Sequence, residues 1–144
     1  MATAAITKNF LHTFNAVEIC GASTTLDISA DSIDVTTSCS TDDDAREFIQ
    51  GRYQWTVSNG GPADVTDAGG VETLFTNVTG GGYVTNAWKL DDGTTTATNP
   101  DFNATASGQT GSFCTALSLT ADTSAAATFS TSIQGSGALT RSES

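Results

Sequence analysis

Residues 114–137 read CTALSLTADTSAAATFSTSIQGSG and contain the clearest strand pattern in the chain. Apolar and polar residues alternate on both sides of a short polar turn, which is typical of two half-buried β-strands. Glycines at 135 and 137 allow the chain to turn sharply after the second strand. The residues predicted to face the core of this strand pair are Phe113, Leu117, Leu119, Ala127, Phe129 and Ile133.

The same alternation recurs upstream and predicts further strands within residues 9–20, 24–38, 53–58 and 83–90. Its phase changes at Asp31–Ser32, where we expect a β-bulge or a tight turn. The predicted core-facing residues of these strands are Leu26, Ile28, Ala30, Ile33, Val35, Tyr53, Trp55, Val57, Val84, Trp88 and Leu90.

One segment has helical spacing instead. Its apolar residues recur at i, i+3, i+4 and i+7, namely Val71, Leu74, Phe75 and Val78. Thr66 or Asp67 can cap the start of this helix, and the glycines at 80–82 end it. The sequence therefore predicts a mainly β protein, a single domain over residues 1–144. We expect a β-sandwich or barrel of antiparallel strands with one short flanking α-helix at about 67–79.

The charge balance excludes several classes of protein. Sixteen acidic residues against five basic ones give a net charge of -11, and the acids are spread along the whole chain. Such a surface repels nucleic acid rather than binding it.

The sequence also lacks the patterns of membrane and secretory segments. No apolar run reaches the roughly 18–20 residues of a membrane helix, and the N-terminus has no secretory-signal pattern.

Catalytic and metal-binding sets are also missing from the sequence. His12 is the only histidine, and the three cysteines Cys20, Cys39 and Cys114 have no paired spacing, so we expect no zinc site. Reduced thiols are the simplest state for them, with one disulfide as the alternative. A structural role is predicted for His12, and we expect a protein that is not an enzyme and needs no cofactor.

Two features leave alternatives open. The acidic run at 42–44 could share a divalent cation, but its contiguous spacing fits a solvated turn with Arg46 in a local ion pair. Trp55 and Trp88 could be stacking platforms for sugars or bases, but each shares a strand face with aliphatic residues and is predicted to be core.

Four stretches, in this order, resemble the tail tube (major tail) proteins of tailed bacteriophages. They are SADSIDVTTS at 29–38, DDDAREFIQGRYQWTVS at 42–58, GGVETLF at 69–75 and CTALSLTADTSAAATFSTSIQGSGALT at 114–140. The resemblance spans roughly residues 24–140, with Gln50 where the family usually has proline.

The resemblance implies a structural virion protein related in fold to the tube protein of the type VI secretion system. Subunits would form hexameric rings that stack into a tail tube, an acidic conduit that carries DNA without specific binding. The implied partners are further copies of the chain and other tail proteins: terminator, tape measure, tip or baseplate, and a sheath in contractile tails. The protein would be synthesised in the host cytoplasm and reside in the tail.

Candidate site residues follow from this interpretation. We expect polar-face acids to point into the lumen, and the candidates are Asp27, Asp31 and Asp34. The loop between Cys39 and Arg52 is the candidate contact with a neighbouring subunit or ring, with the alternative that its apolar residues fold back onto the core. The residues of this candidate contact are Asp42, Asp43, Asp44, Arg46, Phe48 and Ile49.

Two other classes remain open at this stage. Another non-enzymatic virion protein, such as a capsid decoration or tail-tip component, would share the β-rich build and acidic balance. A carbohydrate-binding β-sandwich would instead expose Trp55 or Trp88.

Overall fold

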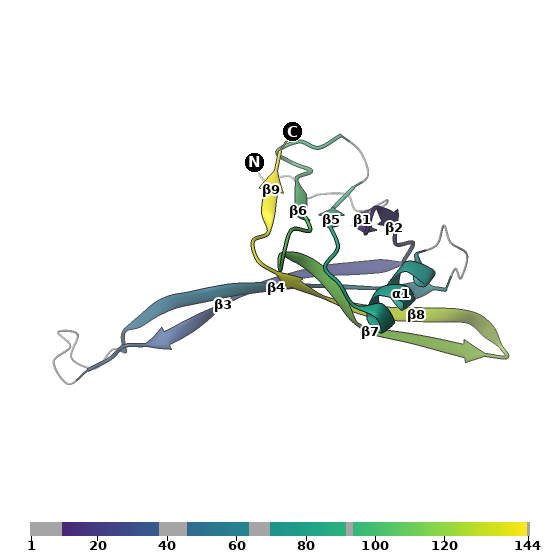
Figure 1. Cartoon of the computed structure of the whole chain (residues 1–144), viewed down its shortest axis with the longest axis horizontal. Helices are drawn as coiled ribbons and strands as arrows, with labels where there is room; N and C mark the ends of the chain where they lie inside the picture. The colour runs from purple at the N-terminus through teal and green to yellow at the C-terminus, as the bar shows by residue number, and fades with distance from the viewer. Residues whose placement is uncertain (1–9, 38–45, 64–69, 92–93, 144) are drawn as a thin grey trace.

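The computed structural model describes residues 10–37, 46–63, 70–91 and 94–143. Two antiparallel sheets of unequal length face each other in these residues, and neither closes into a barrel (Figure 1). The prediction of a mainly β sandwich with one short helix is therefore confirmed.

The long sheet has the strand order β3-β4-β8-β7. Its strands are β3 (Ser23–Asp34), β4 (Phe48–Pro62), β7 (Gly111–Asp122) and β8 (Ala125–Ser136). The opening sequence stretch thus forms the antiparallel pair β7–β8, as predicted. In Figure 1 this sheet runs along the whole length of the molecule, and the β3–β4 hairpin projects beyond the rest. We call the projecting part, residues 30–34 and 48–53, the arm.

The short sheet has the strand order β2-β1-β5-β6-β9 and lies over the middle of the long one (Figure 1). Its strands are β1 (Leu11–Phe14), β2 (Val17–Glu18), β5 (Asn86–Lys89), β6 (Asp101–Ala104) and β9 (Thr140–Ser142). The core lies between the sheets, because strand alternation turns one side of each toward the other. Its largest fully buried apolar residues are Trp55, Phe14, Ile19, Leu74, Ile133 and Val57.

The helix α1 (Val71–Gly80) packs against β7. It starts at Gly70 rather than at a side-chain cap from Thr66 or Asp67, which lie outside the described residues. Gly70 has a left-handed φ of 89°, and a Cβ there would lie 2.6 Å from the Ile19 side chain. The chain therefore enters the helix too close to Ile19 for any larger residue. The predicted glycine stop is confirmed, with Gly81 as C-cap.

Bulges account for the main errors in the predicted strand faces. Thr115 is an extra residue of β7 between Cys114 and Ala116, so the alternation restarts there. Cys114 rather than Phe113 consequently faces the core, while Phe113 packs edge-to-face on Tyr83.

A second bulge lies at Asp31, as predicted, but its extra residue belongs to β4. A Cβ at Gly51 would meet both Asp31 and Ile33, so these two residues share a side. Alternation along β3 then places Asp34 on the other side. Ile33 was predicted to share the face of Leu26 and is instead on the side of Asp31.

Seven further predicted core positions are exposed, because the elements that carry them extend past the short sheet. They are Ile28, Ala30 and Val35 on or just after β3, Tyr53 on β4, Phe75 on α1, Leu119 on β7 and Ala127 on β8. Two polar residues, Asn77 on α1 and Thr131 on β8, are buried instead, and the side chain of each makes a hydrogen bond. Asn77 accepts from the backbone N–H of Cys114, and the Thr131 hydroxyl donates to the carbonyl of Ala116.

Candidate assembly surfaces

The side of the long sheet that faces away from the short one is covered by hydroxyl groups. Cross-strand neighbours there continue across all four strands, for example Thr25 to Ser58 to Ser132. We call this surface the hydroxyl face. Its members are Thr25, Ser29, Thr56, Ser58, Ser118, Thr120, Thr128, Ser130 and Ser132. A sheet side this polar and flat has no core to cover, so it is built to face water.

Asp27 stands on this face, paired with Thr56 across β3 and β4. It is the single acid among the described residues where all four strands lie side by side, and Asp122 stands at the far end of the same face, two residues after Thr120 on β7. Asp31 is on the same side but at the start of the arm, and Asp34 is farther out on the opposite side. The three candidate lumen acids are therefore not one cluster.

The long sheet has two unpaired edges. On the side of β3 that faces away from β4, and on the side of β7 that faces away from β8, no described strand adds to the sheet. The start of β7 is covered, because Ser112 bridges Val84 and the Cys114 N–H donates to Asn77 Oδ1 at 2.7 Å. Along residues 117–122 of β7 no described strand pairs on that side, and such an open strand edge is a template for another strand.

Apolar side chains are exposed beside both edges, on the side of the core. Ile28 on β3 is 52% exposed and Leu119 on β7 is 59% exposed. Phe75 on the adjacent helix is 57% exposed. The short sheet is too narrow to cover them, so the isolated chain leaves apolar area in water at both ends of one sheet.

The arm carries a second apolar group at its far end. Phe48 and Ile49 are 55% and 54% exposed, so they do not fold back onto the core. Asp42, Asp43 and Asp44 lie outside the described residues. The other large exposed apolar residues on or next to the arm are Ile33, Val35 and Tyr53.

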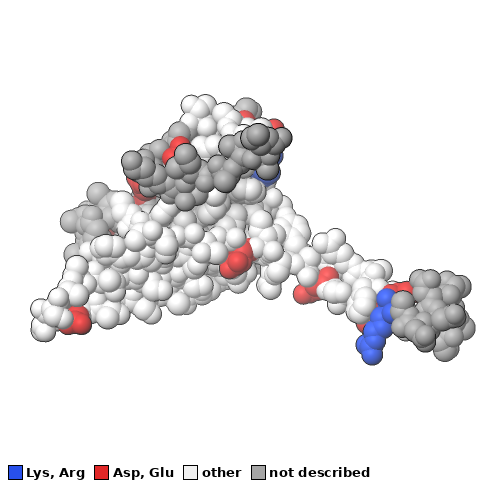
Figure 2. All heavy atoms as spheres, turned by 180° about the vertical axis from the view of Figure 1, so that it is seen from behind, with Lys and Arg blue, Asp and Glu red and all other residues white. Residues whose placement is uncertain are grey.

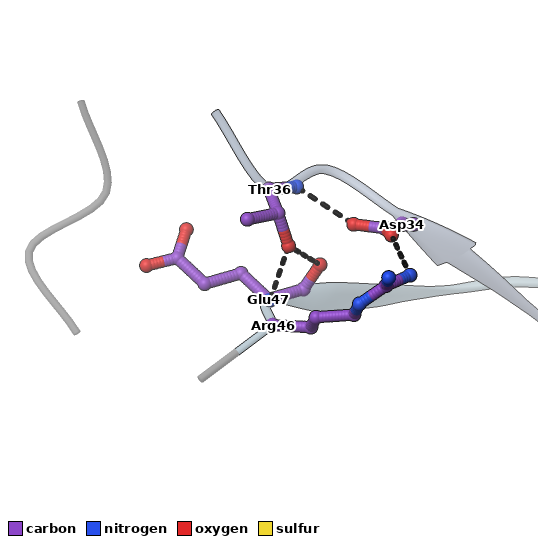
Figure 3. Close-up of polar contacts among 4 residues, drawn as sticks. All are labelled: Asp34, Thr36, Arg46 and Glu47. Carbon is purple, nitrogen blue, oxygen red and sulfur yellow. Dashed lines mark hydrogen bonds and ion pairs between the residues drawn. The ribbon is translucent and has the colours of Figure 1, made fainter. Parts of the chain in front are cut away.

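A polar clamp closes the arm just before its loop (Figure 3). The Glu47 N–H donates to the Thr36 hydroxyl at 2.7 Å, which extends the strand ladder by a side chain. Asp34 accepts from the Thr36 N–H at 2.9 Å and from Arg46 at 3.3 Å. These bonds, those of Thr36 first, lower the pKa of the Asp34 carboxyl. The predicted local ion pair of Arg46 thus exists, with Asp34 as its partner.

Charge is distributed unevenly between body and arm. On the side shown in Figure 2, acidic residues are scattered singly over a mainly uncharged body, and the largest basic area lies on the arm. Arg46 and Arg52 are the exposed basic residues there. The described residues gather no basic surface large enough to hold a duplex.

The polar interior is structural rather than catalytic. His12 is fully buried, donates from Nε2 to Asn86 and accepts at Nδ1 from Asn59. Burial lowers the pKa of this histidine to about 4. In the described part of the chain, no three His, Cys, Asp or Glu side chains come together as metal ligands, and no helix has the length and apolarity to cross a membrane. Trp55 is core, and the Trp88 indole donates to Thr24.

A sandwich with one hydroxyl-covered side, two open strand edges and an apolar arm is typical of a structural protein that pairs with other chains. The comparisons with known proteins identify which kind. The family model described as phage tail tube protein matches residues 11–141, and the chain belongs to that family. It is a structural tail protein and not an enzyme.

Solved structures share the fold at low sequence identity. A chain of the native gene transfer agent virion has a TM-score of 0.76 at 17% identity, covering 96% of this chain and 99% of that one. A chain of the empty gene transfer agent tail, refined with C6 symmetry, has a TM-score of 0.74 at 17% identity over 95% and 98% of the two chains. A chain of the sheath/tube terminator of an extracellular contractile injection system reaches 0.68 at 12% identity over 97% of each chain. No curated protein matches the sequence.

Sequence reasoning missed two of these surfaces. The strand edges could not be seen, because an edge is defined by the order of strands in the sheet. The exposed Phe75 has the spacing of a core residue, and only its place on the helix beside β7 distinguishes it.

Proposed function

We propose that this chain forms hexameric rings that stack into a tail tube through which a genome passes. The observation that carries the proposal is the pair of unpaired edges, β3 and β7, on opposite sides of one sheet. The β7 edge of one copy can pair with the β3 edge of the next copy, which is a head-to-tail contact. When repeated rotation by such a contact returns to the first copy, the copies form a closed ring. The C6 symmetry of a gene transfer agent tail with the same fold supports six copies.

Strand directions are compatible with this closure. All neighbouring strands of the long sheet are antiparallel, so β7 runs opposite to β3. In a rotationally symmetric ring, the next copy's β3 therefore meets β7 in antiparallel pairing. One continuous sheet then surrounds the axis, with no edge left open.

The hydroxyl face is the side we assign to the lumen. Its opposite side is occupied by the short sheet and α1, which have to lie outside such a barrel. DNA carries about one negative charge per 1.7 Å, and hydroxyl groups offer it no counter-charge. Asp27 adds a repeated negative charge to this wall, with Asp31 nearer the arm. The conduit would guide DNA without retaining it, and its acidity would come from few residues.

The arm is the candidate contact with the adjacent ring. The β3–β4 hairpin projects beyond the body (Figure 1), and β4 begins with the exposed residues Phe48 and Ile49, which another copy can cover. Asp34 and Arg46 hold the two strands together at that point. Other tail proteins, namely terminator, tape measure, tip or baseplate and sheath, are partners by the same reasoning. Synthesis in the host cytoplasm before assembly belongs to the same proposal.

Electron microscopy of the purified protein at high concentration tests the proposal. We expect six-fold rings and stacked tubes for the unmodified chain. The double variant F48S/I49S should give rings that stack poorly, while Q50S, an exposed position on the same strand, should stack normally. Particles without a central channel would refute the tube, and normal stacking of F48S/I49S would refute the role of the arm.

A further inference from the structure

We infer that Phe75 on α1 is an intersubunit contact residue that covers Ile28 of the neighbouring copy. This inference rests on the ring proposed above and specifies how its seam is sealed. It gives the single helix a role in assembly, in addition to its packing in the monomer.

The helix is fixed against the edge of β7. Asn77 accepts from the Cys114 N–H at 2.7 Å and donates to the carbonyl of Gly82 at 3.1 Å. Leu74, one turn earlier, is fully buried in the core. These two anchors set the rotation of the helix and therefore the direction of its remaining side chains.

Two grooves show which flank of the helix faces which sheet. One groove joins Thr73 and Thr76 to Asn15, in the turn of the short sheet. The other joins Val78 to Phe113 and Cys114 on β7. Phe75 lies one helical turn before Val78 and on the same flank. It therefore overhangs the β7 edge, where the next strand of a ring would lie.

The strand expected in that place carries a matching side chain. On β3, Ile28 pairs with the buried Trp55, so it points to the core side of the sheet. On β7, Leu117 and Leu119 are on the same side, opposite Thr131 and Phe129 of β8. Antiparallel pairing of β7 with the next β3 brings Ile28 beside these leucines, beneath Phe75. The two copies thus share one apolar seam: one copy contributes the leucines and Phe75, and the next copy contributes Ile28.

A second copy fits this patch better than an unrelated partner. The exposed apolar residues are divided between two opposite edges of one sheet, and each edge also presents unpaired backbone groups. A separate peptide could pair with one edge only, and the other would stay open. A neighbouring copy satisfies both edges and both apolar groups with the same contact.

The test compares two lysine substitutions on the same helix. F75K places a charge in the seam, whereas T76K places it on the opposite flank, one residue away. Both positions are exposed, so both variants should fold and melt like the unmodified chain. We expect the concentration needed for ring assembly, measured by light scattering and electron microscopy, to rise about tenfold or more for F75K only.

A compensating change examines the partner residue. The double variant F75K/I28E should restore assembly, because the two charges would meet across the seam. Rings formed equally well by F75K and T76K would refute the contact while leaving the ring intact. A folded F75K that fails to assemble and is not restored by I28E would refute Ile28 as its partner. If the unmodified chain and T76K both remain monomers, the ring itself is refuted.

Discussion

Asn59 of the long sheet donates a hydrogen bond of 2.9 Å to Nδ1 of His12 in the short sheet. Both side chains are buried, and the other ring nitrogen of His12 lies 2.8 Å from Asn86 Oδ1. An amide nitrogen can only donate, so Nδ1 is the acceptor and Nε2 carries the proton. The two sheets are thus joined through a neutral histidine as well as through the apolar core.

The buried histidine makes stability depend on pH. Its pKa is about 4 in the folded chain and 6.5 when unfolded, so the unfolded state binds the proton first as pH falls. The free energy of unfolding should be fully retained above pH 6.5 and decrease by about 3 kcal/mol between pH 6.5 and pH 4. Urea unfolding of the monomer at several pH values measures this slope.

The H12Q variant is the control for that slope. Glutamine can accept from Asn59 but does not titrate, so H12Q should be less stable at pH 7 yet nearly flat over the same pH window. An unchanged slope in H12Q would assign the effect to the carboxylates. Asp34 and Asp122 have lowered pKa values, so their contribution is lost below this window.

Gly135 should tolerate no side chain. The Trp55 ring lies against it, and a Cβ there would be 2.0 Å from the nearest ring atom. We expect G135A to lose about 3 kcal/mol of unfolding free energy, since a tightly packed core cannot shift to make room. Gly80 at the end of α1 has nothing within 4 Å, so G80A should be neutral or slightly stabilising. Equal stability of the two variants would contradict this packing.

Asn77 links the helix to the long sheet through its amide oxygen, which accepts from Cys114, while its amide nitrogen donates to Gly82 just after the helix. N77L should destabilise the monomer by about 2 kcal/mol, because it leaves the buried N–H of Cys114 without an acceptor. N77D keeps that acceptor but turns a carboxylate oxygen toward the Gly82 carbonyl, so it should also be less stable than the unmodified chain while retaining the bond to Cys114. Hydrogen exchange at Cys114 should accelerate in N77L and stay slow in N77D, and fast exchange in both would contradict the assigned bond.

Charge reversal on the hydroxyl face tests the conduit. D27K should leave folding and tube formation largely intact, because Asp27 is exposed and pairs with Thr56 only across the strands. DNA ejection from particles that carry D27K should slow or stop, since a repeated cation would hold the phosphates. E18K makes the same charge change on the short sheet and should eject normally. Normal ejection from well-formed D27K tubes would refute the lumen position.

Much of the fold was accessible from alternation alone. The pair β7–β8, the helix at Val71–Gly80 and the bulge at Asp31 follow from residue spacing, because side-chain burial has different periods in strands and helices. The errors lie where this periodicity is interrupted. Thr115 restarts the alternation of β7, and nothing in its neighbours distinguishes it from an ordinary strand residue.

The length of the arm is a tertiary property that the sequence does not reveal. Ile28 and Tyr53 have the spacing of core residues, yet they are exposed because the short sheet ends before reaching them. Apolar patterning identifies a face that has to be covered, but not which molecule covers it. For this reason the candidate assembly residues could be proposed from composition and resemblance, while the strand edges required coordinates.

The Asn77 side chain also bears on how neighbouring copies would align within the proposed ring. A strand added to an open edge can slip by two residues, about 6.8 Å, without turning any side chain over. Asn77 already occupies the backbone N–H of Cys114, so an incoming strand meets a stop at that position. A sheet edge with such a stop limits how far the neighbouring strand can slide in that direction. In the proposed ring this favours closure at one level over a spiral, so a single amide contributes to the symmetry of the assembly.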